Sequence, residues 1–293
     1  MVYTSYEDLS NSIRRNLWKV PQDVDLIVGV PRSGMIPALM LAELMNKRCA
    51  DIDAFAEGRE MSCGGRQKLM QEAATTESQR TGRKRVLVLD DTVFSGEALR
   101  KVRERLAPLE GKYEIIYGCV YAEGKNAKEM VDLWLEDIWR PGEKMWLYEW
   151  NILHHYGKKT HVSIWDIDGL VCKDPPDDRN TEAYEAYLPD ALPMVIPTTR
   201  VGAFVTYRLE KYRSITEQWL HGHGINYGLL FMFNADSRDV RNRTESPSKY
   251  KARLYREAKW AHLFIESERR QAERIHKMSG KPVFCYENGQ MYL

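Results

Sequence analysis

The sequence predicts an α/β protein with two parallel-sheet domains. Residues 86–89 form a short apolar run and residues 162–167 a largely apolar one, as expected for strands that are buried on both faces of a sheet. Paired acids lie at the carboxyl end of each strand, where open α/β sheets bind their ligands. Strand and helix patterns surround both sites, so we expect two Rossmann-like domains, residues 1–155 and 156–293.

Alternating strand and helix patterns fill the first half of the chain. Thr4 and Glu7 predict a capping box for a helix that ends near Leu17. A polar stretch, residues 57–82, lacks apolar periodicity and is expected to be a functional lid or a disordered segment. The other predicted elements are strand 26–30, helix 35–46, strand 52–55, strand 86–89, helix 97–106, strand 114–120 and strand 144–150.

The first acidic site begins with Asp90 and Asp91 and continues into a short turn that ends at Gly96. A helical run starts at Glu97, so backbone N–H groups and the positive end of the helix dipole would converge on the turn. Such a turn suits a phosphate, and the carboxylates beside it suit hydroxyl groups or a Mg²⁺ ion. An acidic strand end that merely caps a helix is the structural alternative.

A second turn follows strand 26–30 and reads Pro31-Arg32-Ser33-Gly34. Gly34 permits close approach of the backbone to a ligand, and the guanidinium of Arg32 offers a fork of donors for phosphate oxygens. By itself this segment could be an ordinary strand-to-helix turn. Its position one strand–helix unit before Asp90 favours a role in the same site.

These two motifs resemble those of type I phosphoribosyltransferases. The resemblance implies that Asp90 and Asp91 hold the ribose hydroxyls of phosphoribosyl pyrophosphate (PRPP). Phe94 and Ala98 depart from the usual hydroxyl or small polar residues of that family. The resemblance also implies a 5-phosphate loop of Thr92, Val93, Phe94, Ser95 and Gly96, a pyrophosphate loop of Arg32, Ser33 and Gly34, and lid cations Arg59, Arg66 and Lys68 that reach the pyrophosphate.

The segment Leu147-Tyr148-Glu149-Trp150 resembles the aromatic strand that closes the base-binding side of some purine phosphoribosyltransferases. The similarity to the family covers roughly residues 20 to 150. It contains no pattern that identifies a nucleobase, so the acceptor stays open at this stage.

A second chemical site lies at Asp166-Ile167-Asp168-Gly169, directly after the strand in residues 162–167. Extended geometry would place the two carboxylates on one side, and Gly169 would let the chain turn away. One carboxylate can attack phosphorus if Mg²⁺ offsets the charge repulsion, and the other can protonate the leaving alcohol and activate water. An Asx turn would explain the glycine but not the alternating acids.

This motif resembles the haloacid dehalogenase (HAD) superfamily of phosphatases, and further motifs follow in order. The resemblance implies Thr206 as a ligand of the phosphoryl group, with Arg208 assisting. It also implies a lysine before the last strand, Lys249 or, preferably, Lys251. The implied catalytic residues are Asp166, Asp168, Thr206 and Lys251, and the implied Mg²⁺ ligands are Asp166, Asp168 through its carbonyl, and Glu266 in place of the usual aspartate.

The spacing of these motifs predicts a HAD-like fold with a minimal cap. The Pro- and Asp-rich insert after Asp168 is too short for a large cap domain, so an open site that admits bulky phosphorylated substrates is expected. The predicted elements of this half are strands 162–167, 203–206, 227–233 and 262–265, the last being the final strand, and helices 215–221 and 251–259.

Composition excludes several classes of protein. The 43 Lys and Arg residues nearly balance 42 Asp and Glu, so no global charge would attract nucleic acid. The five cysteines show no CxxC spacing, which argues against a zinc site or a disulfide framework. Neither a signal peptide nor a transmembrane run is visible. We therefore expect a cytoplasmic protein, and its composition is compatible with a homo-oligomer.

Together the two sites predict a bifunctional enzyme. Phosphoribosyl transfer from PRPP leaves a 5-phosphate on the product, which a Mg²⁺-dependent phosphomonoesterase could remove. The pairing resembles ribofuranosyltransferases of bacterial polysaccharide biosynthesis, which implies a glycan acceptor. The alternatives are a nucleobase phosphoribosyltransferase fused to a nucleotidase, which forms a nucleoside, and a PRPP-sensing regulator.

Overall fold

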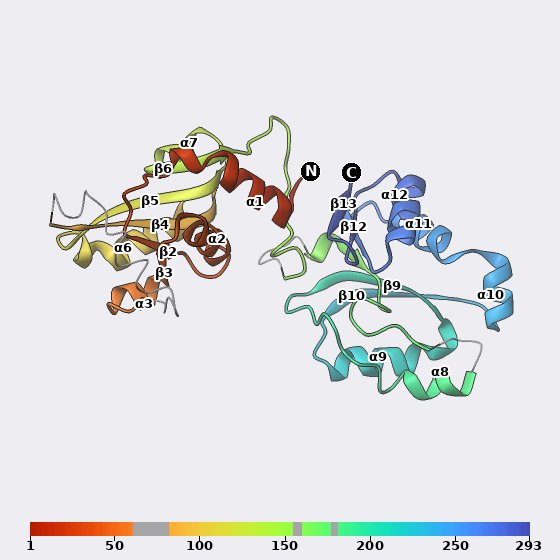
Figure 1. Cartoon of the computed structure of the whole chain (residues 1–293). Coiled ribbons are helices and arrows are strands. Elements are labelled where there is room, and N and C mark those ends of the chain that lie inside the picture. The colour runs from red at the N-terminus through yellow and green to blue at the C-terminus, as the bar shows by residue number, and fades with distance from the viewer. Residues whose placement is uncertain (61–81, 155–159, 177–180) are drawn as a thin grey trace. The chain divides into compact units, whose positions relative to one another are not determined.

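The computed structural model describes residues 1–60, 82–154, 160–176 and 181–293. The chain divides into two compact units, of which one comprises Val2–Trp146 and the other comprises Leu147–Leu293 together with Met1 (Figure 1). The sequence-based boundary, between residues 155 and 156, lies close to this division. In the part of the chain that the structure describes, no helix is long and apolar enough to cross a bilayer.

The N-terminal unit is built on a five-stranded parallel sheet with the order β3-β2-β4-β5-β6 (Figure 1). Neighbouring residues such as Ile27 and Val28 are both fully buried, so the sheet is covered on both faces. Its elements are β1 (Val2–Thr4), α1 (Tyr6–Arg15), β2 (Leu26–Gly29), α2 (Met35–Met45), β3 (Arg48–Asp51), α3 (Ile52–Ala56), β4 (Lys84–Val93), α6 (Glu97–Leu106), β5 (Tyr113–Ala122), α7 (Lys125–Glu129), β6 (Leu133–Asp137) and β7 (Trp146–Tyr148), with short 3₁₀ turns at Leu17–Lys19 and Ala107–Leu109.

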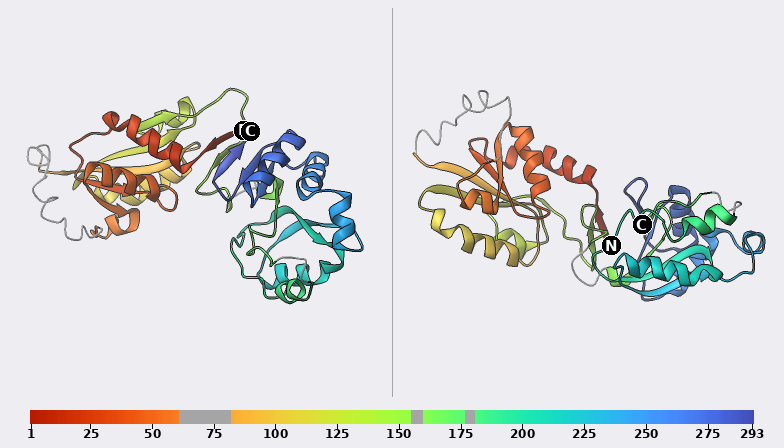
Figure 2. Two further views of the ribbon diagram at one scale, coloured as in Figure 1. Left: turned by 45° about the vertical axis from the view of Figure 1, so that its right-hand side comes forward. Right: turned by 90° about the horizontal axis from the view of Figure 1, so that it is seen from below.

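The C-terminal unit contains a six-stranded sheet with the order β10-β9-β8-β11-β12-β13 (Figure 2). All neighbours are parallel except β12 and β13, which form an antiparallel edge. Its elements are β8 (Ser163–Trp165), α8 (Thr181–Tyr187), β9 (Val201–Leu209), α9 (Arg213–Gly222), β10 (Tyr227–Phe233), α10 (Arg238–Thr244), α11 (Pro247–Glu257), β11 (Leu263–Glu266), α12 (Arg269–Ser279), β12 (Val283–Cys285) and β13 (Gln290–Tyr292), with 3₁₀ turns at Thr160–Val162 and Glu210–Tyr212.

Two predictions at helix starts were wrong. Residues 52–55 form the helix α3 instead of a strand, because the Asp51 side chain accepts a hydrogen bond from the Ala54 amide, 2.8 Å away, and caps a helical turn. The strand β3 lies just before it and pairs with β2. The capping box of α1 is formed by Ser5 and Asp8 and not by the residues one position earlier.

Among the described residues, five strands lay outside the expected elements: β1, β3, β6, β12 and β13. β6 is an edge strand whose only buried residue is Leu135, so it offers no apolar run to mark it. β12 and β13 follow β11, so residues 262–265 do not hold the final strand. Both are only three residues long, which is too short for a periodic signal.

Candidate active sites

The first acidic pair lies near the carboxyl end of β4. β2 ends at Gly29, opposite Leu89, so β4 runs on past its neighbour and carries Asp90 and Asp91 at the edge of the sheet. Both side chains are 8% exposed. Burial, and next the charge of Asp91, raise the pKa of Asp90 well above its usual range. The site therefore holds two buried carboxyl groups side by side, which favours a ligand rich in hydroxyl donors or bound with a cation.

The Pro31–Gly34 turn meets this acidic pair. β2 and β4 are adjacent in the sheet, and the Val30 amide donates a hydrogen bond to the Leu89 carbonyl oxygen at 3.0 Å. A methyl group added to Gly34 would lie 2.9 Å from Asp90 Oδ1. The peptide bond between Pro31 and Arg32 is cis, and Arg32 is exposed. The structure thus brings the two predicted PRPP-binding motifs into one site.

The predicted phosphate loop begins inside β4, since this strand continues to Val93. The Thr92 hydroxyl is buried and has no hydrogen-bond partner among the described residues. Phe94 is 66% exposed, and Ser95 is exposed beside it. Gly96 has a φ of 69° and precedes α6, a conformation that glycine adopts without strain.

The predicted lid falls mostly outside the described residues, including Arg66 and Lys68. Arg59 is described, and its guanidinium pairs with Glu57 at 2.5 Å on the surface. The structure therefore shows a local surface partner for Arg59.

An aromatic residue stands near the same end of the N-terminal sheet. The Trp146 indole donates to the Ile138 carbonyl oxygen at 3.4 Å, and the Ile138 amide donates to the Ala122 carbonyl oxygen at 3.2 Å. Ala122 ends β5, the neighbour of β4. Trp146 is only partly buried, so part of its ring is accessible.

In the C-terminal unit a buried lysine joins two carboxylates. Lys251 Nζ lies 2.7 Å from Asp166 Oδ2 and 2.9 Å from Glu266 Oε2. The three residues come from α11 and from the carboxyl ends of the adjacent strands β8 and β11. The exposed Lys249 does not share this position. Lys251 thus occupies the place that the sequence assigned to a catalytic lysine.

This trio carries two carboxylates and one ammonium. Burial, and next the charge of Glu266, raise the pKa of Asp166 above its usual range, although Lys251 opposes the shift. Burial would lower the pKa of Lys251, but Asp166 and Glu266 outweigh it and hold the ammonium in its charged form. Ser267 adds a hydrogen bond from its hydroxyl to Asp166 Oδ2 at 3.2 Å.

The second acid of the motif, Asp168, pairs with Arg208. Arg208 Nη2 lies 2.6 Å from Asp168 Oδ1, and Arg208 Nε lies 3.1 Å from Asp168 Oδ2. Thr206 is fully buried; its hydroxyl lies 3.4 Å from Asp168 Oδ2 and accepts a hydrogen bond from the Arg208 amide. In the structure both Thr206 and Arg208 therefore hold Asp168, whereas the sequence assigned them to the phosphoryl group.

A cavity of about 610 Å³ opens over Asp166 and Asp168. Its lining also includes residues that the sequence reasoning missed, because they come from segments without a motif. Tyr207 is one of them, and the sequence pattern indicated its neighbour Thr206 as the site residue instead. Gln271 is another, and its side-chain oxygen is buried without a hydrogen-bond partner. Further missed lining residues are Asp174, Ser267, Glu268, Tyr286 and Glu287.

The predicted metal ligands do not form a ready-made site. Among the described residues, no three His, Cys, Asp or Glu side chains are spaced to hold a metal ion. The reason is local, since Lys251 lies between Asp166 and Glu266, and Arg208 holds the Asp168 carboxylate. The excess of negative charge and the oxygen donors of the cavity nevertheless suit a hard cation.

Comparisons with known proteins find a family model and a relative that match the first half of the chain. Residues 2–141 match the family model for the phosphoribosyl transferase domain. A xanthine-guanine phosphoribosyltransferase of Idiomarina loihiensis is 27% identical over 131 residues, which are 44% of this chain and 73% of that protein. The matched residues contain both the Asp90-Asp91 pair and the Pro31–Gly34 turn.

Solved structures give weaker likenesses. The xanthine-guanine-hypoxanthine phosphoribosyltransferase of Helicobacter pylori is 18% identical, with a TM-score of 0.36 over 52% of this chain and 93% of its own. A chain of the Pnkp1/Rnl/Hen1 complex is 15% identical, with a TM-score of 0.32 over 90% of this chain and 96% of its own. TM-scores of this size are too low to support an inference.

Proposed function

We propose that this chain, whose N-terminal half is a phosphoribosyltransferase domain, transfers phosphoribose from PRPP to a purine-type base and then removes the 5-phosphate. The close approach of Gly34 to Asp90 carries the proposal, because it joins the pyrophosphate loop and the ribose-binding acids in a single site. The acceptor follows from the likeness to a xanthine-guanine phosphoribosyltransferase. The partly buried ring of Trp146 offers a surface on which a flat base could stack.

In the transfer step, Asp90 and Asp91 accept hydrogen bonds from the ribose hydroxyls. The turn from Thr92 to Gly96 binds the 5-phosphate, and the Arg32–Gly34 turn holds the pyrophosphate. The bond between the ribose C1 and pyrophosphate breaks, a bond to a ring nitrogen of the base forms, and the proton of that nitrogen goes to the departing pyrophosphate or to water. The products are a nucleoside 5′-monophosphate and pyrophosphate.

We infer that the C-terminal half then hydrolyses the phosphate ester. An oxygen of Asp166 attacks phosphorus and the ester bond breaks. Asp168, released from Arg208 and carrying a proton taken from solvent, gives that proton to the leaving 5′-oxygen. Asp168 next takes a proton from water, which attacks the aspartyl phosphate and releases inorganic phosphate. The buried contact of Asp166 with Lys251 supports this assignment, since the ammonium can offset charge on the phosphoryl group.

Mg²⁺ is part of this proposal. Asp166 and Asp168, through its carbonyl, would hold the ion with Glu266 as the third predicted ligand. When bound there, Mg²⁺ would offset the repulsion between the attacking carboxylate and the phosphate.

Product analysis of three forms of the enzyme tests both steps. With PRPP, Mg²⁺ and guanine, xanthine or hypoxanthine, the wild type should form a nucleoside. Asp166→Asn should accumulate the nucleoside 5′-monophosphate, heavier by one phosphoryl group, and Asp90→Asn with Asp91→Asn should form neither. Mass spectrometry distinguishes these products.

Each step can fail separately. A dephosphorylated product from Asp166→Asn would remove Asp166 as the nucleophile. If no base gives a product but a glycan is ribosylated, the acceptor is a glycan and not a nucleobase. Transfer that persists in the Asp90→Asn, Asp91→Asn variant would refute the PRPP site.

A further inference from the structure

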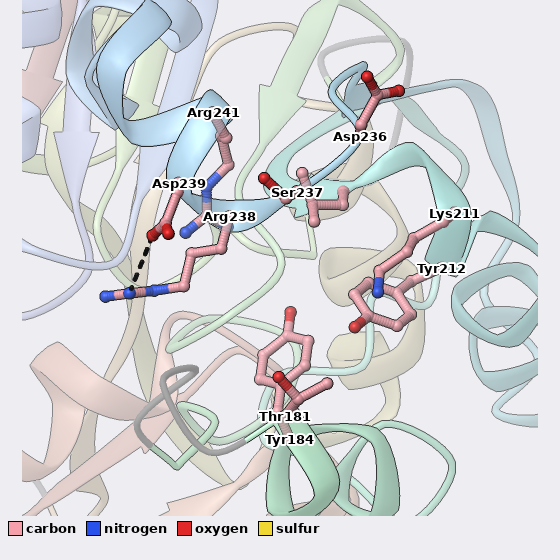
Figure 3. Close-up of a pocket in the computed structure, with 10 residues that line it drawn as sticks. Thr181, Tyr184, Lys211, Tyr212, Asp236, Ser237, Arg238, Asp239 and Arg241 are labelled. Carbon is pink, nitrogen blue, oxygen red and sulfur yellow. Dashed lines mark ion pairs between the residues drawn. The ribbon is translucent and has the colours of Figure 1, made fainter.

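A second cavity in the C-terminal unit, of about 330 Å³, has no role in the chemistry described above. Three segments line it: the helix α8, the residues that follow β9, and the start of α10 with the loop before it (Figure 3). β9 is the parallel neighbour of β8, and β10 is the parallel neighbour of β9, so this cavity belongs to the same edge of the sheet as Asp166. Its volume lies at the low end for ligand pockets and suits one ring system with its sugar.

Two residues in contact link this cavity to the one over Asp166. Tyr207 lines the Asp166 cavity, whereas Arg241 lines the second cavity. The Arg241 guanidinium lies over the Tyr207 ring, 4.2 Å from its centre, and its Nη1 donates to the Tyr207 carbonyl oxygen at 2.9 Å. A lining residue of one cavity therefore contacts a lining residue of the other. A ligand that extends past this pair could enter both.

The lining combines aromatic rings with charged groups of both signs. The rings of Tyr184 and Tyr212 lie 5.4 Å apart at 58° and face the side chains of Arg238 and Arg241 across the cavity (Figure 3). Asp236 adds an acceptor on the rim. Rings of this kind stack on flat heteroaromatic groups, and the guanidinium and carboxylate groups match the acceptors and donors of a base edge.

We propose that this second cavity binds the base of a nucleoside 5′-monophosphate whose phosphate lies in the Asp166 cavity. The inference rests on the proposed function, because it takes the product of the N-terminal half as the substrate of the C-terminal half. The cavity would make the phosphatase selective for a nucleotide over a plain sugar phosphate. Tyr212 is the residue best suited to a test, since it is only partly buried.

The test compares phosphate release from guanosine 5′-monophosphate and from ribose 5-phosphate by the full chain. The wild type should prefer the nucleotide, and Tyr212→Ala should lower kcat/KM for the nucleotide about tenfold or more. Its kcat/KM for ribose 5-phosphate should stay unchanged. Tyr212→Phe keeps the ring and should resemble the wild type.

Trp260→Ala is the matched control. This aromatic residue is 38% exposed and lies beside Gly202, near the amino end of β9, so its loss should leave both substrates unaffected. Equal use of both substrates by the wild type would overturn the base site. A loss in Tyr212→Ala that is the same for both substrates would overturn it as well.

Failure of the phosphatase assignment gives a different pattern. If the wild type releases phosphate from neither substrate, the hydrolytic step is wrong, and the base site is then judged by binding alone. Calorimetry with guanosine, in the Asp90→Asn, Asp91→Asn background, should show binding that Tyr212→Ala weakens about tenfold or more. Unchanged or absent binding would refute the base site independently.

Discussion

Arg208 donates hydrogen bonds to both carboxylate oxygens of Asp168, with Nη2 2.6 Å from Oδ1 and Nε 3.1 Å from Oδ2. The arginine side chain is 1% exposed, whereas the Asp168 side chain is 20% exposed and faces the cavity. The pKa of Arg208 is raised, because the attraction of Asp168 outweighs the effect of burial, and the guanidinium stays charged. A planar fork fixes the orientation of a carboxylate in a way that a single ammonium cannot.

Arg208→Lys should therefore impair phosphate release while keeping the charge. We expect kcat for a generic phosphate ester to fall about tenfold or more, since misorientation of a proton-transfer group forfeits much of its 10²- to 10⁴-fold contribution. Steady-state kinetics with p-nitrophenyl phosphate checks this. Arg213→Lys is the control, because Arg213 forms its ion pairs with Glu210 and Glu217 at the surface. Equal activity of the two variants would show that the fork does not position Asp168.

Lys251→Met should destabilise the protein strongly, since it leaves Asp166 and Glu266 buried without their cation. Removal of one partner from a buried ion pair costs about 3–5 kcal/mol. Lys249→Met, two positions earlier and exposed, should change the free energy of unfolding by no more than about 0.5 kcal/mol. Urea unfolding measures both. Adding Asp166→Asn to Lys251→Met should restore part of the loss, and strict additivity of the two changes would argue against the coupling.

Gly34→Ala should damage the N-terminal site by crowding. The added methyl group would lie 2.7 Å from the Val30 carbonyl oxygen and 2.9 Å from Asp90 Oδ1. Crowding of this kind costs about 1–3 kcal/mol, and we expect PRPP-dependent pyrophosphate release to fall with it. Gly111→Ala provides the control, because nothing lies within 4 Å of its added methyl group. If Gly34→Ala released pyrophosphate at the wild-type rate, the close approach of Gly34 to Asp90 would not be needed for activity.

Asp90→Asn should stabilise the protein without its ligand at neutral pH. Burial and Asp91 raise the pKa of Asp90 in the folded state, so the folded protein binds this proton more tightly than the unfolded chain does. The free energy of unfolding therefore falls as pH rises from the unfolded pKa, about 3.9, through the folded value. Asn does not ionise, so the Tm of the variant should exceed that of the wild type at pH 7.

The stability difference should shrink as pH falls through the raised pKa of Asp90 toward about 4, because the wild-type carboxyl is then protonated in the folded protein. Thermal unfolding over a series of pH values, without PRPP, measures the trend. Asp53→Asn is the control, since the Asp53 side chain is 73% exposed. A Tm difference that does not depend on pH would contradict the role of ionisation.

The sequence by itself determined the features that depend on short, local patterns. The parallel strands β2, β4 and β8 contain buried apolar runs, residues 26–28, 86–89 and 164–165, because both of their faces are covered, and such runs are visible without a structure. Glycine and acids at strand ends mark the turns where ligands bind, so Gly34, Asp90 and Asp166 could be identified directly. The matched phosphoribosyl transferase domain contains the first two.

Only the tertiary structure decided which side chains these residues meet. Nothing local indicates that Lys251 would lie between Asp166 and Glu266, or that Arg208 would hold Asp168, because those contacts span 85, 15 and 40 positions of the chain. Short edge strands such as β6 and β13 were also not predicted, since their exposed faces carry no apolar pattern. The cavity beside Tyr212 is built from three separate segments, and only folding brings them together.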